Sequence, residues 1–238
     1  MVRIEAFNTG NRLLDQLNSE DLGQLSRRMD RQTVPLHGTL LSPGEPVNFA
    51  YFPITNVLSS IVVMRDGSAV EAAAIGNEGL AGVGLLTGER SSAYLLVQQV
   101  EGECLRVPAD HFRSVLRDSG QLRDVVVRYA LILLQQCSQN AACNVRHGAD
   151  ERMSRWILAC ADRADRNQFD ITQDYLGIML GISRQSVSAV IASLQRQDLI
   201  SYRRRHLKIL DRAGLERSSC ECYDVAVSAY EDLMGLGA

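Results

Sequence analysis

The spacing of apolar and polar residues changes several times along the chain, and each change predicts a different element. Leucines recur at helical spacing within residues 11–29, which predicts an N-terminal helix. Residues 33–108 instead consist of short apolar runs separated by turns rich in glycine and proline. The runs are NFAYF, VLSSIVVM, AVEAAAI, AYLLVQQV and CLRV. Short strands at this spacing predict an antiparallel sandwich or barrel.

A long helix is predicted after the strands. Asp118 and Ser119 supply N-cap chemistry, and neither glycine nor proline occurs between Gln121 and His147. At 1.5 Å per residue, such a helix would span about 40 Å. One seam along it, apolar at its start and polar at its end, consists of Leu122, Val126, Tyr129, Leu133 and Gln136. The helix either crosses the core of the β domain or pairs with its copy, and we expect a dimer whose polar seam residues set the register.

Two short helices are predicted near the C-terminal end, after a further helix over residues 150–163. Ile171 and Leu176 flank Thr172 as a hydrophobic staple around an N-cap, and Gly181 ends that helix. Ser183 caps the next helix, whose apolar residues share one face. These apolar residues are Val187, Val190, Ile191 and Leu194. Two short helices around a glycine-containing turn form a helix-turn-helix.

The polar face of the second helix carries side chains suited to DNA. The major groove, about 12 Å wide, admits one α-helix and presents base edges that side chains distinguish. Arg184 and Gln185 occupy the first turn, where arginine can bind a guanine edge and glutamine an adenine edge. Thr172 and Gln173 are expected to bind phosphate. The full set of predicted DNA contacts is Thr172, Gln173, Ser183, Arg184, Gln185, Ser186, Ser188, Arg203, Arg204 and Arg205.

A basic hairpin follows these helices in the segment LISYRRRHLKIL. Two short apolar strands, around residues 200–202 and 207–210, flank a turn with Arg203, Arg204 and Arg205. Such a β-wing is suited to phosphate contact. The alternative is an ordinary pair of packed helices followed by a solvated hairpin. Because the basic hairpin comes directly after the helix pair, DNA binding is favoured.

The positive charge of the chain is concentrated in one segment near the C-terminal end. The 238 residues allow two modest domains, and the net charge of −3 indicates no polyanionic partner for the molecule as a whole. Between residues 183 and 212, however, seven Lys/Arg outnumber two Asp/Glu, a local excess of five positive charges. This excess agrees with DNA contact, although a solvated basic surface is the other interpretation.

Targeting signals and a cysteine framework are not predicted. The first residues, MVRIEAFN, lack the apolar stretch of a signal peptide, and the longest apolar run, YALILL, is too short for a membrane span. We therefore expect a cytosolic protein without membrane association. The six cysteines lack the spacing of a disulfide framework and are expected to be free thiols. Cys220 and Cys222 form a C-x-C pair, a weak metal signal on its own, so no metal site is predicted.

The segment TQDYLGIMLGISRQSVSAVIASLQRQDLI, followed by RRRHLKILDRAGLE, resembles the winged helix-turn-helix of the Crp/Fnr family of bacterial transcription regulators. The strongest match covers residues 171–216, and the order of the preceding segments agrees. The resemblance implies an α+β fold: an antiparallel, cyclic-nucleotide-binding-like β-roll with N-terminal helices (1–117), a dimerisation helix (118–146) and a DNA-binding domain with a C-terminal tail (147–238). It further implies a homodimer that reads two half-sites on double-stranded DNA, contacts RNA polymerase and responds to a signal.

Two departures from the family pattern bear on function. The family's recognition helix commonly reads S-R-x-T-V-S-R, but Ala189 replaces the last arginine, so base reading depends more on Arg184 and Gln185. Family members that bind cyclic AMP carry a glutamate for the ribose where this chain has Gly82. The other candidate effector contacts implied by the resemblance are Arg90, Ser91, Cys137 and Ser138. We expect no binding of cyclic AMP, and no other cofactor is predicted.

An enzyme and a sensory or scaffolding protein are the two alternative functional classes. An enzyme is disfavoured because the sequence has no H-E-x-x-H, G-x-S-x-G or Walker motif. A sensory or scaffolding protein of the same fold, with weakened DNA binding, is favoured by Ala189 and opposed by the three arginines of the wing. The signal, the operator sequence and the direction of regulation do not follow from the sequence.

Overall fold

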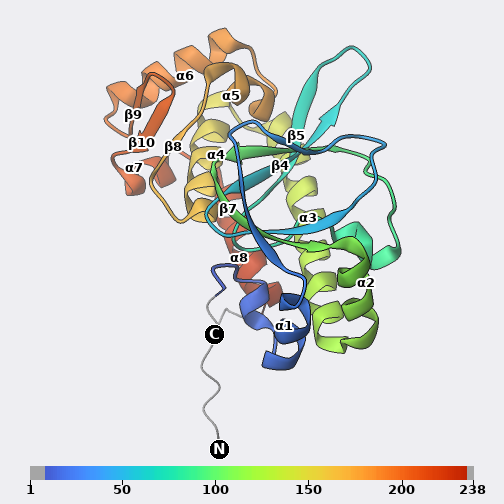
Figure 1. Ribbon diagram of the computed structural model, residues 1–238. Helices are drawn as coiled ribbons and strands as arrows, with labels where there is room; N and C mark the ends of the chain where they lie inside the picture. Colours follow the sequence, from blue (N-terminus) through green and yellow to red (C-terminus); the bar gives the residue numbers. More distant parts are fainter. Residues whose placement is uncertain (1–8, 235–238) are drawn as a thin grey trace, which may run out of the picture.

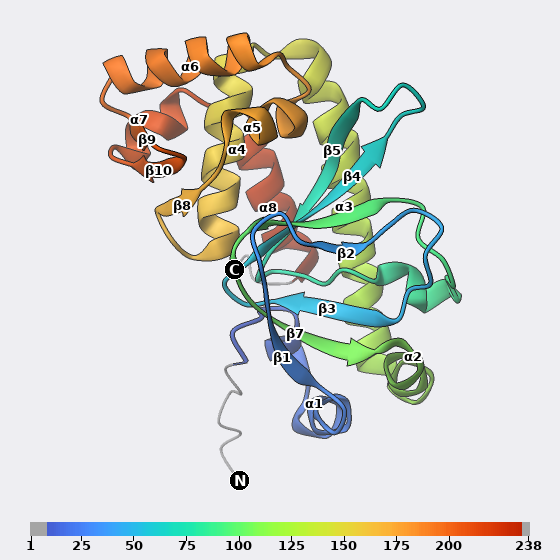
Figure 2. The ribbon, with the colours of Figure 1, turned by 45° about the horizontal axis from the view of Figure 1, so that its top comes forward.

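The chain is described by a computed structural model that covers residues 9–234 (Figure 1). The expectation drawn from the first eight residues lies outside the described residues. A β domain, a long helix beside it and a smaller helical domain with its own sheet make up the molecule (Figures 1 and 2). This is the α+β fold expected from the sequence.

The β domain consists of two antiparallel sheets. The first has the order β1-β7-β3 and contains β1 (Asp30–Val34), β7 (Gly102–Pro108) and β3 (Phe49–Pro53). The second has the order β2-β6-β4-β5 and contains β2 (Thr39–Leu41), β6 (Leu95–Val100), β4 (Val57–Val63) and β5 (Ala69–Ile75). Five strands lie at the predicted apolar runs. Strand β1 was not predicted because its sequence, DRQTV, is mostly polar and exposed.

Short helices close the β domain. They are η1 (Leu14–Gln16), α1 (Ser19–Ser26), η2 (Val83–Thr87) and α2 (Ala109–Asp118). The single helix predicted over residues 11–29 is divided, because the Asn18 side chain accepts the Asp21 N–H at 2.8 Å and starts a new helix. Helix α2 was not predicted. It buries Phe112 and Leu116 in the core between the two sheets and the long helix.

The long helix α3 (Gly120–Arg146) begins where predicted, since the Ser119 hydroxyl accepts the Leu122 N–H at 2.9 Å. Its first half crosses the core of the β domain. Leu122 and Val126 are fully buried in that core, and Tyr129 is 1 % exposed. The seam predicted for a dimer therefore packs within the chain itself, and the prediction for these residues was wrong. Leu133 packs at the edge of the same core. Gln136 lines a cavity between α3 and the C-terminal helix of residues 222–234.

A second apolar stripe occupies the opposite, exposed side of α3. Its residues recur at alternating spacings of four and three, which is the heptad pattern of a coiled-coil seam. The stripe consists of Val127, Leu131, Leu134, Ser138, Ala141 and Val145, and all six residues are exposed. Leu134 is 64 % exposed and Val145 is 83 % exposed. We refer to these six residues as the heptad stripe.

The C-terminal part contains the remaining elements. They are α4 (Ala149–Ala164), β8 (Gln168–Asp170), α5 (Gln173–Leu180), α6 (Arg184–Arg196), β9 (Ile200–Arg203), β10 (His206–Ile209), α7 (Arg212–Arg217) and α8 (Cys222–Met234). Helix α8 returns to lie against α3, and its Tyr230 and Met234 join the core of the β domain. The tail expected to belong to the DNA-binding domain thus holds the two domains together.

One apolar core joins the β domain to the helical domain. Residues of β4, β5 and β6 pack with those of α4, α5 and α6. At its centre the Glu71 carboxylate accepts hydrogen bonds from Ser59 Oγ at 2.6 Å and from Trp156 Nε1 at 3.2 Å. Burial raises the pKa of Glu71, and the hydrogen bonds from Ser59 and Trp156 offset only part of that effect.

Glu71→Gln should stabilise the protein at alkaline pH. A carboxyl with a raised pKa binds its proton more tightly in the folded state, so its stabilising contribution is present at acid pH and is lost as the pH rises through the folded pKa. Glutamine stays neutral throughout. Urea unfolding should give Glu71→Gln the larger free energy of unfolding at pH 8, with the difference shrinking towards pH 5. The exposed Glu231→Gln serves as control, and a pH-independent difference would contradict the assignment.

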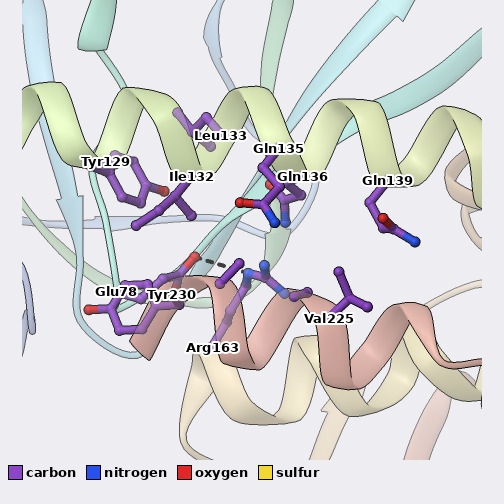
Figure 3. A pocket seen from close by; sticks show the side chains of 12 residues that line it. Glu78, Tyr129, Ile132, Leu133, Gln135, Gln136, Gln139, Arg163, Val225 and Tyr230 are labelled. Carbon is purple, nitrogen blue, oxygen red and sulfur yellow. Dashed lines mark hydrogen bonds and ion pairs between the residues drawn. The ribbon is translucent and has the colours of Figure 1, made fainter. Parts of the chain in front are cut away.

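An ion pair between two largely buried side chains also joins the β domain to the helical domain. Arg163 of α4 donates from Nε to the Glu78 carboxylate at 3.0 Å, and their side chains are 16 % and 12 % exposed. Figure 3 shows the pair beside Tyr129, Gln136 and Tyr230, at a cavity of about 40 Å³ between α3 and α8. The pair therefore fixes α4 to the loop that follows β5.

Within residues 9–234 no single helix is both long and apolar enough to cross a membrane. Helices α5 and α6 taken together pass the same test by length and composition only, and they meet at 104°.

Candidate nucleic-acid interface

Helices α5 and α6 form the helix-turn-helix that the sequence predicts. The Thr172 hydroxyl accepts the Tyr175 N–H at 3.1 Å, and the Ser183 hydroxyl accepts the Ser186 N–H at 3.1 Å. Gly181 ends α5 in the left-handed region, with φ of +61°. The angle of 104° between the helices lies within the usual range for this motif. Both predicted caps and the predicted glycine are confirmed.

Helix α6 has one buried face and one exposed face. Val187, Ile191 and Leu194 are at most 3 % exposed and pack in the interdomain core. The opposite face consists of Arg184, Gln185, Ser188, Ala189, Ala192 and Gln195, all exposed. In both ribbon views α6 lies at the outer edge of the molecule (Figures 1 and 2). A major groove can therefore approach this face of α6.

Contacts between α5 and α6 hold several of the predicted DNA-binding side chains. Ser188 Oγ donates to Gln173 Oε1 at 2.7 Å, and this hydrogen bond links the exposed surfaces of α6 and α5. Arg184 Nε lies 3.4 Å from the Asp174 carboxylate, with both side chains more than two-thirds exposed. An exposed pair is worth only about 0–1 kcal/mol, so Arg184 can exchange Asp174 for a base edge at little cost. The sequence interpretation missed Asp174, although an acid in the first turn of α5 was a visible signal.

The wing is a three-stranded sheet in the order β8-β10-β9. Strands β9 and β10 pair so that Arg203 faces His206, which leaves Arg204 and Arg205 as a two-residue turn. Both have positive φ, of 49° and 75°, which this turn type requires and which asparagine and glycine adopt more easily than arginine. All three wing arginines are exposed. Strand β8 was not predicted because it has only three residues, one of them buried.

One side of the helix-turn-helix faces the β domain. The Tyr175 ring lies 4.4 Å from the His37 ring, measured between centroids. Burial lowers the pKa of His37, and the nearby charge of Arg205 adds to this effect. Helix α5 is therefore held against the loop between β1 and β2, while α6 and the tip of the wing remain accessible.

The part of the chain that contains α5, α6 and the wing matches a known protein family. A family model described as the Crp-like helix-turn-helix domain matches residues 151–218. Residues 151–218 are a Crp-like helix-turn-helix domain. No curated protein sequence matches the chain.

Solved structures extend the likeness beyond the Crp-like domain. FixK2 from Bradyrhizobium japonicum is 16% identical, with a TM-score of 0.68 over 81% of this chain and 98% of its own. CLP from Xanthomonas campestris, described as a c-di-GMP-responsive global regulator, is 15% identical, with a TM-score of 0.65 over 82% and 100%. TTHB099 from Thermus thermophilus, a CRP-family transcriptional regulator, is 19% identical, with a TM-score of 0.65 over 79% and 96%. The chain has the fold of the Crp/Fnr regulators.

The β domain that accompanies the Crp-like domain contains a cavity of about 190 Å³. Gly82 and Cys137, both predicted as effector contacts, line it. Arg90, Ser91 and Ser138 are exposed and do not line it, so the structure does not bring the five candidates together. Most of the lining side chains are apolar, from β3, β5, β6 and α3.

Proposed function

We propose that the protein is a homodimeric, sequence-specific DNA-binding regulator of transcription, rather than an enzyme, and that its β domain receives the signal. The observation that carries the proposal is the exposed polar face of α6 beside an arginine wing, on a helix whose other face is fixed in the core. Base edges would be read by Arg184 and Gln185, and phosphates would be bound by the wing arginines. RNA polymerase is the further partner in this proposal.

The heptad stripe supports the homodimer. A second copy of α3 would present the same spacing of apolar residues, and apolar side chains at alternating four- and three-residue spacing pack together in paired helices. Ser138 interrupts the stripe with a small polar residue that can favour one register. Two copies of the Crp-like domain would then face two half-sites of an operator.

Cyclic AMP is not the effector in this proposal. The cavity is lined by Glu89 and, among the described residues, by no lysine or arginine, so a cyclic phosphate would meet a carboxyl group without a cation. Burial raises the pKa of Glu89, in keeping with its apolar surroundings. Calorimetry with millimolar cyclic AMP should show no saturable binding. Micromolar binding that depends on Arg90 would contradict this.

A sensory protein with weakened DNA binding is the second candidate. Ala189 favours it, because a methyl group stands at the centre of the outward face of α6, where an arginine would reach the groove. Salt-dependent binding to DNA separates the two candidates, because phosphate contacts make affinity fall steeply with salt.

Arg184→Ala and Arg204→Ala should weaken DNA binding in different ways. Loss of Arg184, a base-reading side chain in this proposal, should reduce affinity for the specific site by about 1–3 kcal/mol and relax preference at one base pair per half-site. Loss of Arg204 should weaken specific and random DNA alike and flatten the salt slope by about one unit per half-site. Fluorescence anisotropy on both DNAs at several salt concentrations, with operators selected from random sequence, measures both effects.

Arg28→Ala is the matched control for these variants. Arg28 is an exposed arginine two residues after α1, and it pairs with Asp110 at 2.9 Å. Helix α1 lies at the opposite end of the molecule from α6 (Figure 1). Replacement of Arg28 should leave the affinity for both DNAs unchanged. An equal loss on both DNAs for Arg184→Ala, with sequence preference intact, would remove α6 from base reading. Absence of salt-dependent binding in the parent protein would favour the second candidate.

A further inference from the structure

Four metal-ligating side chains from distant segments meet at the junction between α3 and α8. Cys143 lies in the last turn of α3, and His147 is the residue that ends that helix. Cys220 lies between α7 and α8, and Cys222 is the first residue of α8. One ligand atom from each of the four residues lies within 4.8 Å of the others, and the three cysteines are buried.

Two of the distances between the ligand atoms match those of tetrahedral coordination, and all of them are below 4.8 Å. Cys143 Sγ lies 3.6 Å from Cys220 Sγ, and Cys222 Sγ lies 3.6 Å from His147 Nδ1. A tetrahedral ion with bonds of about 2.3 Å to sulfur and about 2.0 Å to nitrogen places two sulfurs about 3.8 Å apart and sulfur and nitrogen about 3.5 Å apart. The group is too compact for an iron–sulfur cluster, whose ligands are divided between separate irons.

The surrounding groups orient the ligands. The Nε2 atom of His147 lies 3.1 Å from the Glu221 carboxylate, which leaves Nδ1 directed at the cluster. A carboxylate on the outer nitrogen is the usual second partner of a metal-binding histidine. Gln139 Nε2 donates to Cys222 Sγ at 3.0 Å. The His147 N–H donates to the Cys143 carbonyl at 3.1 Å, which fixes the two ligands of α3 on one side of the helix end.

The surrounding charge suits an anionic metal site. Three thiolates around a divalent cation carry a net charge of −1. The charges of Arg152 and Arg155 both act on Cys143, and the buried Nε atom of each lacks a hydrogen-bond partner among the described residues. Arg152 also donates through Nη2 to the Leu180 carbonyl at the end of α5. Arg152 thus connects the cluster to the end of α5 in the helix-turn-helix.

We propose that Cys143, His147, Cys220 and Cys222 bind one Zn²⁺ ion with tetrahedral coordination. Three thiolates and an imidazole, with all four positions filled by protein, are the donor set of a structural zinc site. The ion fixes α8 to the end of α3, at the joint where α3 passes into α4 and the Crp-like domain. The C-x-C pair alone was a weak signal, and folding brings it to a cysteine and a histidine four residues apart on another helix.

Metal analysis of the reduced, untagged protein tests the site. The parent protein and the Cys137→Ser control should each hold one zinc per chain, since Cys137 lies on α3 away from the cluster. Cys222→Ser should hold none above background. Glu221→Gln, which keeps all four ligands, should weaken zinc affinity by about 10–100-fold in competition with a chelator.

Cobalt(II) substitution in the parent protein keeps the test independent of how the variants fold. The exchanged protein should show the visible absorption of tetrahedral cobalt with thiolate-to-metal charge transfer, and Cys137→Ser should show the same spectrum. A reduced parent protein that takes up neither zinc nor cobalt would overturn the proposal. So would equal zinc in Cys222→Ser, or a Cys143–Cys220 disulfide in the freshly purified protein. Iron at the same stoichiometry would overturn the assignment to zinc.

Discussion

Glutamate at both Leu131 and Leu134 should convert the protein from a dimer into monomers. The two leucines are 49 % and 64 % exposed in the single chain and lie at the centre of the heptad stripe. Burying a leucine contributes about 1.5–3 kcal/mol, and a dimer would lose four of them. Since both leucines are already partly buried in the single chain, only about half of this burial is at stake, so a loss of roughly 3 kcal/mol or more should raise the dissociation constant of the dimer by about two orders of magnitude. Sedimentation equilibrium measures this constant directly.

Gln135→Glu provides the matched control for charge on the same helix. Gln135 is exposed and lies next to Leu134 but outside the heptad stripe, so its replacement should leave the dimer intact. The double glutamate variant should also lose affinity for an operator with two half-sites, while binding to a single half-site changes little. A parent protein that sediments as a monomer at micromolar concentration would contradict the dimer, and an unchanged constant in the variant would place the interface elsewhere.

Helix α3 shows where a periodic pattern is informative and where it is ambiguous. Its existence and its N-terminal cap follow from local chemistry, and the structure confirms both. The choice of face does not follow, because α3 is apolar on two sides. The side with Leu122 and Tyr129 packs in the β domain, and the side with Leu131 and Leu134 stays exposed. Periodicity alone does not show which of two apolar faces binds a second chain. The answer depends on which face the sheets of the same chain cover.

The helix-turn-helix could be predicted almost completely because its signals are local. Thr172, Gly181 and Ser183 each act on backbone groups within four residues, and the apolar face of α6 repeats within four turns. Strands with polar or very short sequences, such as β1 and β8, carry no such signal and are held by pairing with distant strands.

The contacts between domains could not be predicted from the sequence. Glu78 and Arg163 are 85 residues apart, and Cys143 and Cys220 are 77 residues apart. Neither pair has a periodic or spacing signal that joins its two members. Each becomes visible only when α4 and α8 have packed against α3 and the β domain. The effector candidates carried over by resemblance are not brought together for the same reason, because Arg90 and Ser91 are exposed and do not line a cavity whose shape other elements determine.

Arg163→Ala should destabilise the protein by about 3–5 kcal/mol, because removing one partner leaves an uncompensated charge of low exposure. The Glu78 carboxylate would keep its hydrogen bonds from the Gly76 N–H, at 3.1 and 3.2 Å, but would lose its cation. Urea unfolding monitored by circular dichroism measures the loss. Arg128→Ala, at an exposed position of α3, controls for truncation of an arginine.

A double-mutant cycle identifies the pair as the cause of this effect. Glu78→Gln combined with Arg163→Met removes both charges while roughly keeping the side-chain volumes, so the combined variant should be more stable than Arg163→Ala despite carrying one more substitution. Because the pair joins α4 to the loop after β5, Arg163→Ala should also speed amide exchange in that loop, measured by mass spectrometry. If the losses from Glu78→Gln and Arg163→Met simply added, the two side chains would not be coupled, and the joint would depend on the apolar core that α4 shares with β4 and β6.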